Sequence, residues 1–320
     1  MPRTDARGPE QPMLATLSDR RTFDADMLFE RKLDGVRALA VRDGDLVRLL
    51  SRTGRDLGPT YPEVVAALTA QPVRDFTVDG EITAVRGGRS DFALLQQRMQ
   101  LTRAEDVRAS PVAVRYYLFD LLRLDGRDTT ALPLRSRKSL LRRALEFRAP
   151  LHYTTHRVGR DGRELLAGAC ARGWEGLIAK RADGRYRRGR SPDWLKLKCA
   201  ADQELVIGGF TEPAGSRVGF GALLVGHYQD GRLRYAGKVG TGYDTPTLHA
   251  LRARLEHLEQ ERPPFADPVR EPGAHWVRPE LVAQIAFTEW TRAGRLRHPR
   301  YLGLREDKRP TEVVRERSTP

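Results

Sequence analysis

The feature that most constrains the fold is a change of sequence pattern just after Lys198. Before this residue, helix-like and strand-like segments alternate. After it, residues 204–240 form three strand-like runs, and a single helix-like segment follows. Turn residues separate the three runs at Glu212-Pro213, Gly219–Gly221 and Asp230-Gly231. Several short strands with one helix are typical of a small β-barrel such as an OB-fold.

We therefore expect an α+β chain of two domains with a border at 200–204. The 320 residues are enough for two ordinary domains. The first is expected over residues 13–200 and the second, a barrel, over 201–310. The stretches 1–12 and 311–320 are expected to be flexible tails.

Local signals predict the individual elements. Asp43-Gly44 lies between two apolar runs and predicts a β-hairpin over 36–50. Thr60 to Glu63 has the pattern of a capping box, which predicts a helix that ends at Leu68. Further helices are predicted over 91–100, 136–147, 161–172 and from Thr245, and further strands over 76–85, 116–122, 177–180, 194–198 and 281–290.

The net charge of +14 is concentrated in two places. Residues 181–200 hold seven Arg or Lys against two Asp, and residues 291–309 hold seven against two acidic residues. Such clustering favours a polyanionic partner, nucleic acid before an anionic membrane. A solvated basic loop is the alternative for either segment alone.

Other function classes are excluded by what the sequence lacks. No run of 18 apolar residues is present, so no transmembrane helix is expected, and the first residues do not resemble a secretory signal. Cys170 and Cys199 are the only cysteines, too few for a disulfide scaffold or a four-Cys zinc site. We expect a reducing compartment and a passive, buried Cys199.

Lysine is scarce in this chain, which has 49 Arg and only seven Lys. The seven are Lys32, Lys138, Lys180, Lys196, Lys198, Lys238 and Lys308. Lysine differs from arginine in that it can lose its proton in a protein and then act as a nucleophile. The retained lysines therefore indicate that at least one position needs a reactive amine.

Three segments carry residues suited to phosphoryl chemistry. Lys32 lies in a Lys-x-Asp-Gly-x-Arg sequence, where nearby cations favour a nucleophilic amine over a merely charged hairpin. Strand alternation puts Asp79 and Glu81 on one face, where they could hold a ribose hydroxyl or Mg²⁺. The same alternation pairs Lys196 with Lys198 as a phosphate clamp, unless they merely protect an edge strand.

In their order and spacing, these segments resemble the covalent nucleotidyltransferase superfamily of DNA ligases, RNA ligases and capping enzymes. The similarity rests on Lys32-x-Asp-Gly-x-Arg, Ser51-Arg52-Thr53-Gly54, Asp79-Gly80-Glu81, Phe119-Asp120, Glu175-Gly176 and Trp194-x-Lys-x-Lys. Two further stretches, Tyr235 to Gly242 and Leu296 to Lys308, resemble the ATP-dependent ligase module of bacterial end-joining ligases. The resemblance covers about residues 12–310.

The resemblance implies an adenylation (nucleotidyltransferase) domain followed by an OB-fold domain, with ATP and Mg²⁺ or Mn²⁺ as cofactors. It makes Lys32 the residue that carries AMP, places Glu30 at the adenine and stacks Phe119 on that base. Glu81 and Glu175 would bind the metal. The remaining implied positions are Arg37, Arg52, Glu81, Lys180, Lys196 and Lys198 for the nucleotide, and Arg305, Asp307 and Lys308 for orienting pyrophosphate.

The resemblance also implies the substrate and the partners. The substrate would be nicked or broken duplex DNA, sealed in DNA repair or recombination by a monomer in the bacterial nucleoid. Partners would be a Ku-type end-binding protein and separate polymerase and nuclease proteins, and no membrane. Two alternatives stay open: an RNA ligase or capping-type nucleotidyltransferase, and a non-catalytic DNA-binding relative that kept the fold.

Overall fold

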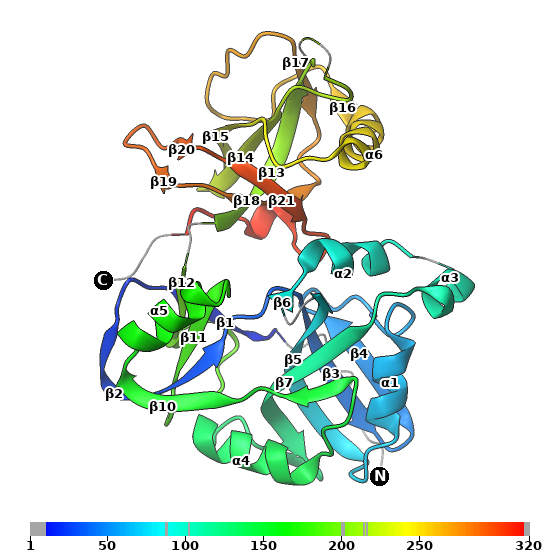
Figure 1. Cartoon of the computed structure of the whole chain (residues 1–320), viewed down its shortest axis with the longest axis vertical. Coiled ribbons are helices and arrows are strands. Elements are labelled where there is room, and N and C mark those ends of the chain that lie inside the picture. The colour runs from blue at the N-terminus through cyan, green and yellow to red at the C-terminus, as the bar shows by residue number, and fades with distance from the viewer. Residues whose placement is uncertain are drawn as a thin grey trace. The chain divides into compact units, whose positions relative to one another are not determined.

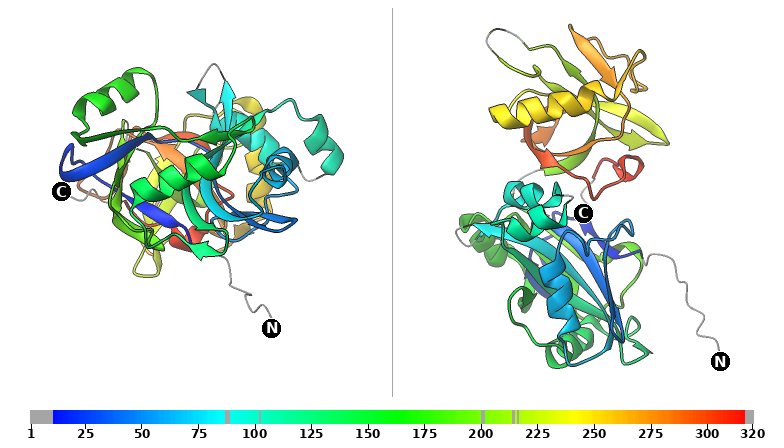
Figure 2. Two further views of the ribbon diagram at one scale, coloured as in Figure 1. Left: turned by 90° about the horizontal axis from the view of Figure 1, so that it is seen from below. Right: turned by 90° about the vertical axis from the view of Figure 1, so that its right-hand side faces the viewer.

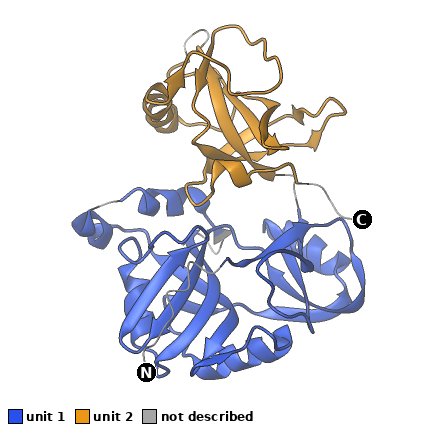
Figure 3. Cartoon of the chain, turned by 180° about the vertical axis from the view of Figure 1, so that it is seen from behind, with its two compact units in different colours: residues 1–199, 317–320 blue, residues 200–316 orange. Residues whose placement is uncertain are grey.

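The structure, a computed structural model, describes residues 11–86, 89–101, 103–199, 202–213, 215 and 217–316. The chain divides into two compact units, residues 1–199 with 317–320 and residues 200–316 (Figure 3). The change of sequence pattern after Lys198 thus coincides with the end of the first unit. Residues 1–10 and 317–320 of the expected tails, and residues 200 and 201 of the expected border, lie outside the described residues.

The first unit contains two β-sheets (Figure 1). One has the strand order β1-β12-β11-β2-β10, and the other has the order β4-β3-β5-β7-β8 with β6 and β9 paired beside it. The strands of the first sheet are β1 (Met13–Leu17), β2 (Thr22–Arg31), β10 (His156–Asp161), β11 (Gly176–Arg181) and β12 (Gly189–Lys198). Those of the second are β3 (Val36–Asp43), β4 (Leu46–Ser51), β5 (Asp75–Arg86), β6 (Arg89–Ser90), β7 (Val114–Leu124), β8 (Arg127–Asp128) and β9 (Leu151–Tyr153).

The described residues of this unit form five helices, and each buries an apolar side. They are α1 (Pro62–Thr69), α2 (Phe92–Met99), α3 (Ala104–Ala109), α4 (Leu134–Ala144) and α5 (Arg163–Ala171). The largest core joins the second sheet to α1, α2 and α4 through fully buried residues such as Leu68, Leu95 and Leu141. A smaller core joins α5 to the first sheet through Phe29, Leu166 and Ala169.

Most predicted elements of the first unit are confirmed, with corrections to three helices. The helix expected over 136–147 is α4, which begins at Leu134 and ends at Ala144. The hairpin turns at Gly44, whose φ of +62° suits the Asp-Gly turn. The capping box is wrong, because Tyr61 is the N-cap of α1 and no side chain caps that helix. The helix expected from Asp161 begins at Arg163 instead, since Asp161 is the last residue of strand β10.

The second unit is a β-structure with one principal helix (Figure 2). Its central strand, β13, pairs with β14, β17 and β18 along different parts of its length. The elements are β13 (Asp202–Thr211), β14 (Leu223–Gln229), β15 (Arg232–Val239), α6 (Thr245–Glu256), β16 (Glu259–Gln260), β17 (Ala274–Val277), β18 (Val282–Ala286), β19 (Glu289–Trp290), β20 (Leu296–Arg297), β21 (Arg300–Leu304) and the 3₁₀ turn Pro310–Glu312. The single strand expected over 281–290 is therefore two strands, β18 and β19.

The tail expected from residue 311 is wrong for residues 311–316. Val313 is only 6% exposed and packs in the core of the second unit. Gln203 donates a hydrogen bond to the Val314 carbonyl at 2.9 Å and accepts one from the Glu316 amide at 3.0 Å. The second unit therefore extends past the predicted end at 310. None of the helices in the described ranges has both the length and the apolar character needed to cross a lipid bilayer.

The two cysteines form a disulfide, so the expectation of a passive Cys199 thiol is wrong. Cys170 lies in α5 and Cys199 directly follows β12, with their Cα atoms 5.4 Å apart. The Cys199 amide also donates to the Glu175 carbonyl at 3.0 Å. The bond therefore ties α5 to the last residue of the first unit.

Reduction of this disulfide should lower the free energy of unfolding by about 3–4 kcal/mol, because the bond joins residues 29 apart and restricts the unfolded chain. Denaturant unfolding followed by far-UV circular dichroism, with and without a reducing agent, measures the change. A Cys170→Ser/Cys199→Ser variant should resemble the reduced protein and not respond to the reducing agent. Equal stabilities of oxidised and reduced protein would contradict this expectation.

Candidate active site

One wall of the site is a face of the first sheet. In the strand register, Lys180 lies opposite Trp194, Ile178 opposite Lys196, and Glu30 opposite Ile178. Residues opposite one another on neighbouring strands share a face, and so do residues two apart on one strand. Glu30, Lys180, Lys196 and Lys198 therefore share one face, as the alternation of Lys196 and Lys198 predicted.

The facing wall is formed by the second sheet. Arg37 on β3 lies opposite Glu81 on β5, and Glu81 lies opposite Tyr117 on β7, two residues before Phe119. Contacts between the walls are direct, since the Lys180 Nζ atom is 4.0 Å from the centre of the Phe119 ring. The fold thus places most of the predicted nucleotide-binding residues on these two sheets, which meet at Lys180 and Phe119.

Lys32 lies just past the end of β2, where the β11–β2 ladder holds it. Its amide donates to the Gly176 carbonyl at 3.0 Å, and its Nζ atom pairs with the Glu175 carboxylate. The two side chains are 16% and 21% exposed, so solvent and substrate can reach the pair. The carboxylate is an acceptor at hand for the proton that the amine must lose before it can act as a nucleophile.

Arg37 is a fixed cation rather than a mobile one. Its Nε and Nη2 atoms lie 2.5 and 2.6 Å from the two Asp79 oxygens, and Nη2 donates to the Met13 carbonyl at 3.0 Å. Burial alone would lower the pKa of Arg37, but the Asp79 carboxylate outweighs it and raises that pKa. Asp79 is fully buried and also accepts from the Tyr186 hydroxyl at 2.6 Å. Asp79 therefore holds Arg37, whereas Glu81 is the more exposed carboxylate of the pair.

Phe119 packs in the core between the two sheets of the first unit. Its side chain is 7% exposed and packs edge-on against Trp194, with ring centres 5.9 Å apart. The Arg37 guanidinium lies 4.6 Å from its ring centre. Stacking of Phe119 on adenine stays a prediction. Arg52 is half-buried in the turn after β4, at the edge of the same sheet.

A buried ion cluster lies on the first wall. Glu30, Lys138 and Lys180 are each at most 2% exposed, and both lysines pair with the Glu30 carboxylate. Burial alone would raise the pKa of Glu30, but the two lysines outweigh it and lower that pKa. Lys138 was not predicted as a site residue. Its only sequence signal was the scarcity of lysine.

The predicted pyrophosphate-orienting residues belong to the second unit. Both Asp307 oxygens accept from Arg305 at 3.0 Å, and Asp307 is 3% exposed. Burial would raise the pKa of Asp307, but Arg305 and Lys308 outweigh it and lower that pKa. The Lys308 Nζ atom is 3.2 Å from a Glu204 oxygen. Within the second unit, Asp307 therefore holds the Arg305 guanidinium in place. The approach of Arg305, Asp307 and Lys308 to a nucleotide stays a prediction.

The chemistry of the site residues fits a nucleoside triphosphate with a divalent cation. Four cations of the site, Lys32, Arg37, Lys196 and Lys198, match a phosphate chain. The described residues include no group of three or more His, Cys, Asp or Glu side chains that could hold a metal alone. Mg²⁺ needs no such group, because one or two carboxylates and substrate phosphates commonly bind it. Glu81 and Glu175 fit that donor set.

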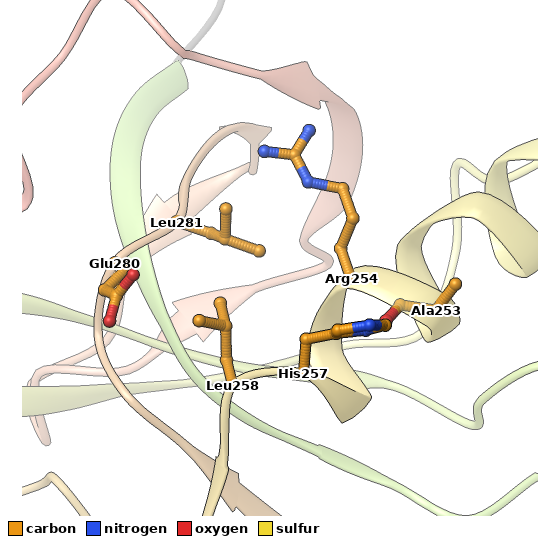
Figure 4. A pocket seen from close by; sticks show the side chains of 6 residues that line it. All are labelled: Ala253, Arg254, His257, Leu258, Glu280 and Leu281. Atoms are coloured by element: carbon orange, nitrogen blue, oxygen red, sulfur yellow. The ribbon is translucent and has the colours of Figure 1, made fainter.

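Two hollows lie away from the predicted residues. One, of about 370 Å³, lies in the second unit between the end of α6 and the loop before β18 (Figure 4). Arg254, His257 and Leu281 are among its lining residues. The other, of about 520 Å³, lies along the second sheet beyond Leu39 and Tyr186. Neither hollow is lined by a residue of the predicted nucleotide site.

Comparison with known proteins agrees with this geometry. Residues 12–198 match a family described as "ATP dependent DNA ligase domain", and residues 216–308 match "ATP dependent DNA ligase C terminal region". A multifunctional non-homologous end joining protein LigD of Pseudomonas aeruginosa is 40% identical over 315 residues, covering 96% of this chain and 36% of that protein. LigD of Mycobacterium tuberculosis is 38% identical over 312 residues, covering 95% of this chain and 40% of that protein. This chain thus spans well under half of each relative.

A solved structure is also similar. The mycobacterial DNA ligase D complexed with ATP and MES has a TM-score of 0.66 and 36% identity, covering 96% of this chain and 98% of that one. The predicted order of an adenylation domain followed by an OB-fold region is confirmed by these comparisons.

Proposed function

Because the chain belongs to the ATP-dependent DNA ligase family, we propose that it seals breaks in duplex DNA with ATP as the energy source. The observation that carries this proposal is the partly exposed Lys32–Glu175 pair, which lies in the same unit as the cations Arg37, Lys196 and Lys198. A covalent nucleotide carrier needs a reachable amine, and Lys32 is the reachable lysine in the family's nucleophile position.

In the first step, the Lys32 Nζ atom forms a bond to the α-phosphorus of ATP, and the bond from that phosphorus to the bridging oxygen breaks. Pyrophosphate leaves, and the amine proton passes to Glu175 or to solvent. Lys196, Lys198 and Arg37 stabilise the charge that spreads over the phosphoryl oxygens. Because Asp79 fixes Arg37, this cation needs no rearrangement during the reaction.

In the later steps, AMP passes from Lys32 to the 5′-phosphate of the DNA, and the 3′-hydroxyl of the adjacent strand then displaces AMP. A divalent cation, Mg²⁺ or Mn²⁺, supplies charge neutralisation at the phosphates when bound. Glu81 and Glu175 are the residues that we propose to hold it. Glu30 and Phe119 are proposed to bind the adenine, and Arg52 the ribose or the DNA phosphate.

We propose further that the protein acts in end joining. Its similarity to LigD proteins, which are named for non-homologous end joining, supports this assignment. A Ku-type end-binding protein and separate polymerase and nuclease activities are the partners that such a ligase would need.

Incubation with labelled ATP, followed by a chase into nicked DNA, tests the proposed activity. The expected result is label on the protein that moves to DNA and is released as AMP when the nick closes. Transfer from GTP would favour a capping-type enzyme, and sealing of RNA alone would favour an RNA ligase. Absence of any covalent label would favour a non-catalytic DNA-binding relative.

Lys308→Ala should slow adenylation about tenfold or more while leaving closure of a nick that already carries 5′-AMP unchanged. Arg305 and Lys308 belong to the second unit, yet pyrophosphate exists only in the first step. We therefore propose that the second unit rotates about the border near 200–204 between steps. Single-turnover rates on the two substrates measure the difference.

Lys238→Ala is the matched control, because Lys238 also lies in the second unit and pairs with a single carboxylate, that of Glu271, at 2.9 Å. It should leave adenylation unchanged. A Lys308→Ala protein that adenylates normally, or that fails equally on both substrates, would refute this division of labour.

A further inference from the structure

Lys138, Lys180 and Glu30 form a buried cluster with more positive charge than is needed to neutralise its single carboxylate. Lys138 Nζ donates to one Glu30 oxygen and to the Thr154 carbonyl at 2.9 Å. Lys180 Nζ lies 2.6 Å from the other Glu30 oxygen. One buried carboxylate is thus held by two buried ammonium groups, although a single partner would neutralise it.

Stability alone does not account for such a cluster. Removing several charged groups from water is costly, and well-packed apolar side chains of similar size are often as stable as a buried ion pair or more so. The chain also uses lysine at Lys138 although arginine supplies most of its positive charge. These observations favour a role in which the carboxylate must keep both its charge and its orientation.

The cluster touches the ring proposed to bind the base. Lys180 Nζ lies 4.0 Å from the centre of the Phe119 ring and 4.1 Å from that of Trp194. Glu30 itself is two residues before Lys32 on the same strand end. Lys180 therefore links the Glu30 carboxylate to the Phe119 ring that is proposed to bind the base.

The two lysines differ in how they hold the carboxylate. Burial lowers the pKa of Lys180 to about 8, although Glu30 acts in the opposite direction. Lys138 is anchored from a separate helix, α4, and its second bond to Thr154 fixes its position. Lys138 is therefore held at the Glu30 carboxylate by a fixed geometry.

We propose that Lys138 is a positioning residue for base selection, which fixes the ionised Glu30 carboxylate so that it accepts a hydrogen bond from the exocyclic amine of adenine. The inference rests on the proposed ligase function. An ionised carboxylate can only accept hydrogen bonds, and its two oxygens have about four sites, so sites remain after the lysines are bound. Adenine offers an amino donor at its sixth position, whereas guanine offers a carbonyl oxygen, which a carboxylate repels.

The test compares ATP with inosine triphosphate (ITP), which carries a carbonyl oxygen in place of the adenine amine. For the full-length protein, the rate divided by KM is measured for covalent transfer of AMP and of IMP to Lys32. The ratio of the two values is the base preference. Lys138→Met should raise KM for ATP and reduce the base preference about tenfold or more.

Two controls separate positioning from support of the fold. Arg142→Met changes an exposed cation one turn further along α4, and should keep the wild-type preference. Adding Lys138→Met to Glu30→Gln should cause no further loss of preference, because Lys138 acts through Glu30. If Lys138→Met does not fold by circular dichroism, Lys138→Gln takes its place, since it keeps a donor without the charge.

An equal fall of both rates in Lys138→Met, with the preference unchanged, would overturn the inference, and so would a further loss in the double variant. Failure of the proposed function would look different. In that case the wild-type protein itself would acquire no AMP from ATP, whatever residue stands at position 138.

Discussion

The Lys32→Arg protein is expected to fold normally and to acquire no labelled AMP from ATP. Arginine keeps the positive charge beside Glu175, so the ion pair and the local fold survive. It cannot lose its proton in a protein, however, and so offers no nucleophile to the α-phosphorus. The loss should therefore be complete within the detection limit of denaturing gel electrophoresis with labelled ATP.

Lys238→Arg is the matched control for this substitution. Lys238 lies in the second unit and is 59% exposed, so the same exchange there should leave adenylation at the wild-type rate. Thermal unfolding of both variants verifies that the fold is intact. Label on purified Lys32→Arg protein would show that another residue carries AMP.

Binding of nicked duplex DNA should weaken by about 10³–10⁵-fold between 50 and 200 mM salt, if about six to ten phosphates are contacted. Each neutralised phosphate releases condensed counterions, so log K falls with log salt at a slope of about −0.9 per phosphate. The structure supports this expectation, because Arg185, Arg187, Arg188 and Arg190 are all exposed. Fluorescence anisotropy with labelled DNA across a salt series measures the slope.

Replacing two of these arginines, as in Arg185→Ala/Arg188→Ala, should make the slope less steep by about 0.9 for each phosphate that the variant no longer neutralises. Arg74→Ala serves as the comparison, because Arg74 is exposed but pairs with Asp45 outside both basic segments. A binding constant that does not change over this salt range would exclude a mainly electrostatic interface.

The elements that could be predicted from sequence are those with a local signal. The hairpin at Asp43-Gly44 could be predicted from its turn residues and the apolar runs beside them alone. Strand β10 was missed because most of its residues are exposed and it shows no apolar alternation. It forms because its backbone pairs with that of β2. In this pairing Asp161 lies opposite Thr22, which is more than 130 residues earlier in the chain. The segment 311–316 was missed for a similar reason, since Val314 bridges to Tyr228.

The residues of the site divide in the same way, into those with a local sequence signal and those placed by distant parts of the chain. The shared face of Lys196 and Lys198 follows from the two-residue period of a strand, so sequence alone was sufficient. The pairing of Lys138 with Glu30 joins residues 108 apart and depends on how α4 packs, so no local pattern could reveal it. The role of Asp79 was partly mistaken for the same reason, because its partner Arg37 lies on a neighbouring strand.

The Cys170–Cys199 bond also makes the oxidised protein convenient to label. Both cysteines of the chain are used in the bond, so no native thiol competes for a maleimide dye. Two introduced thiols, Thr69→Cys in the first unit and Gln229→Cys in the second, lie at exposed positions. If the second unit rotates as proposed, energy transfer between a donor and an acceptor dye at these positions should change on addition of ATP, and single-molecule measurements would follow that change.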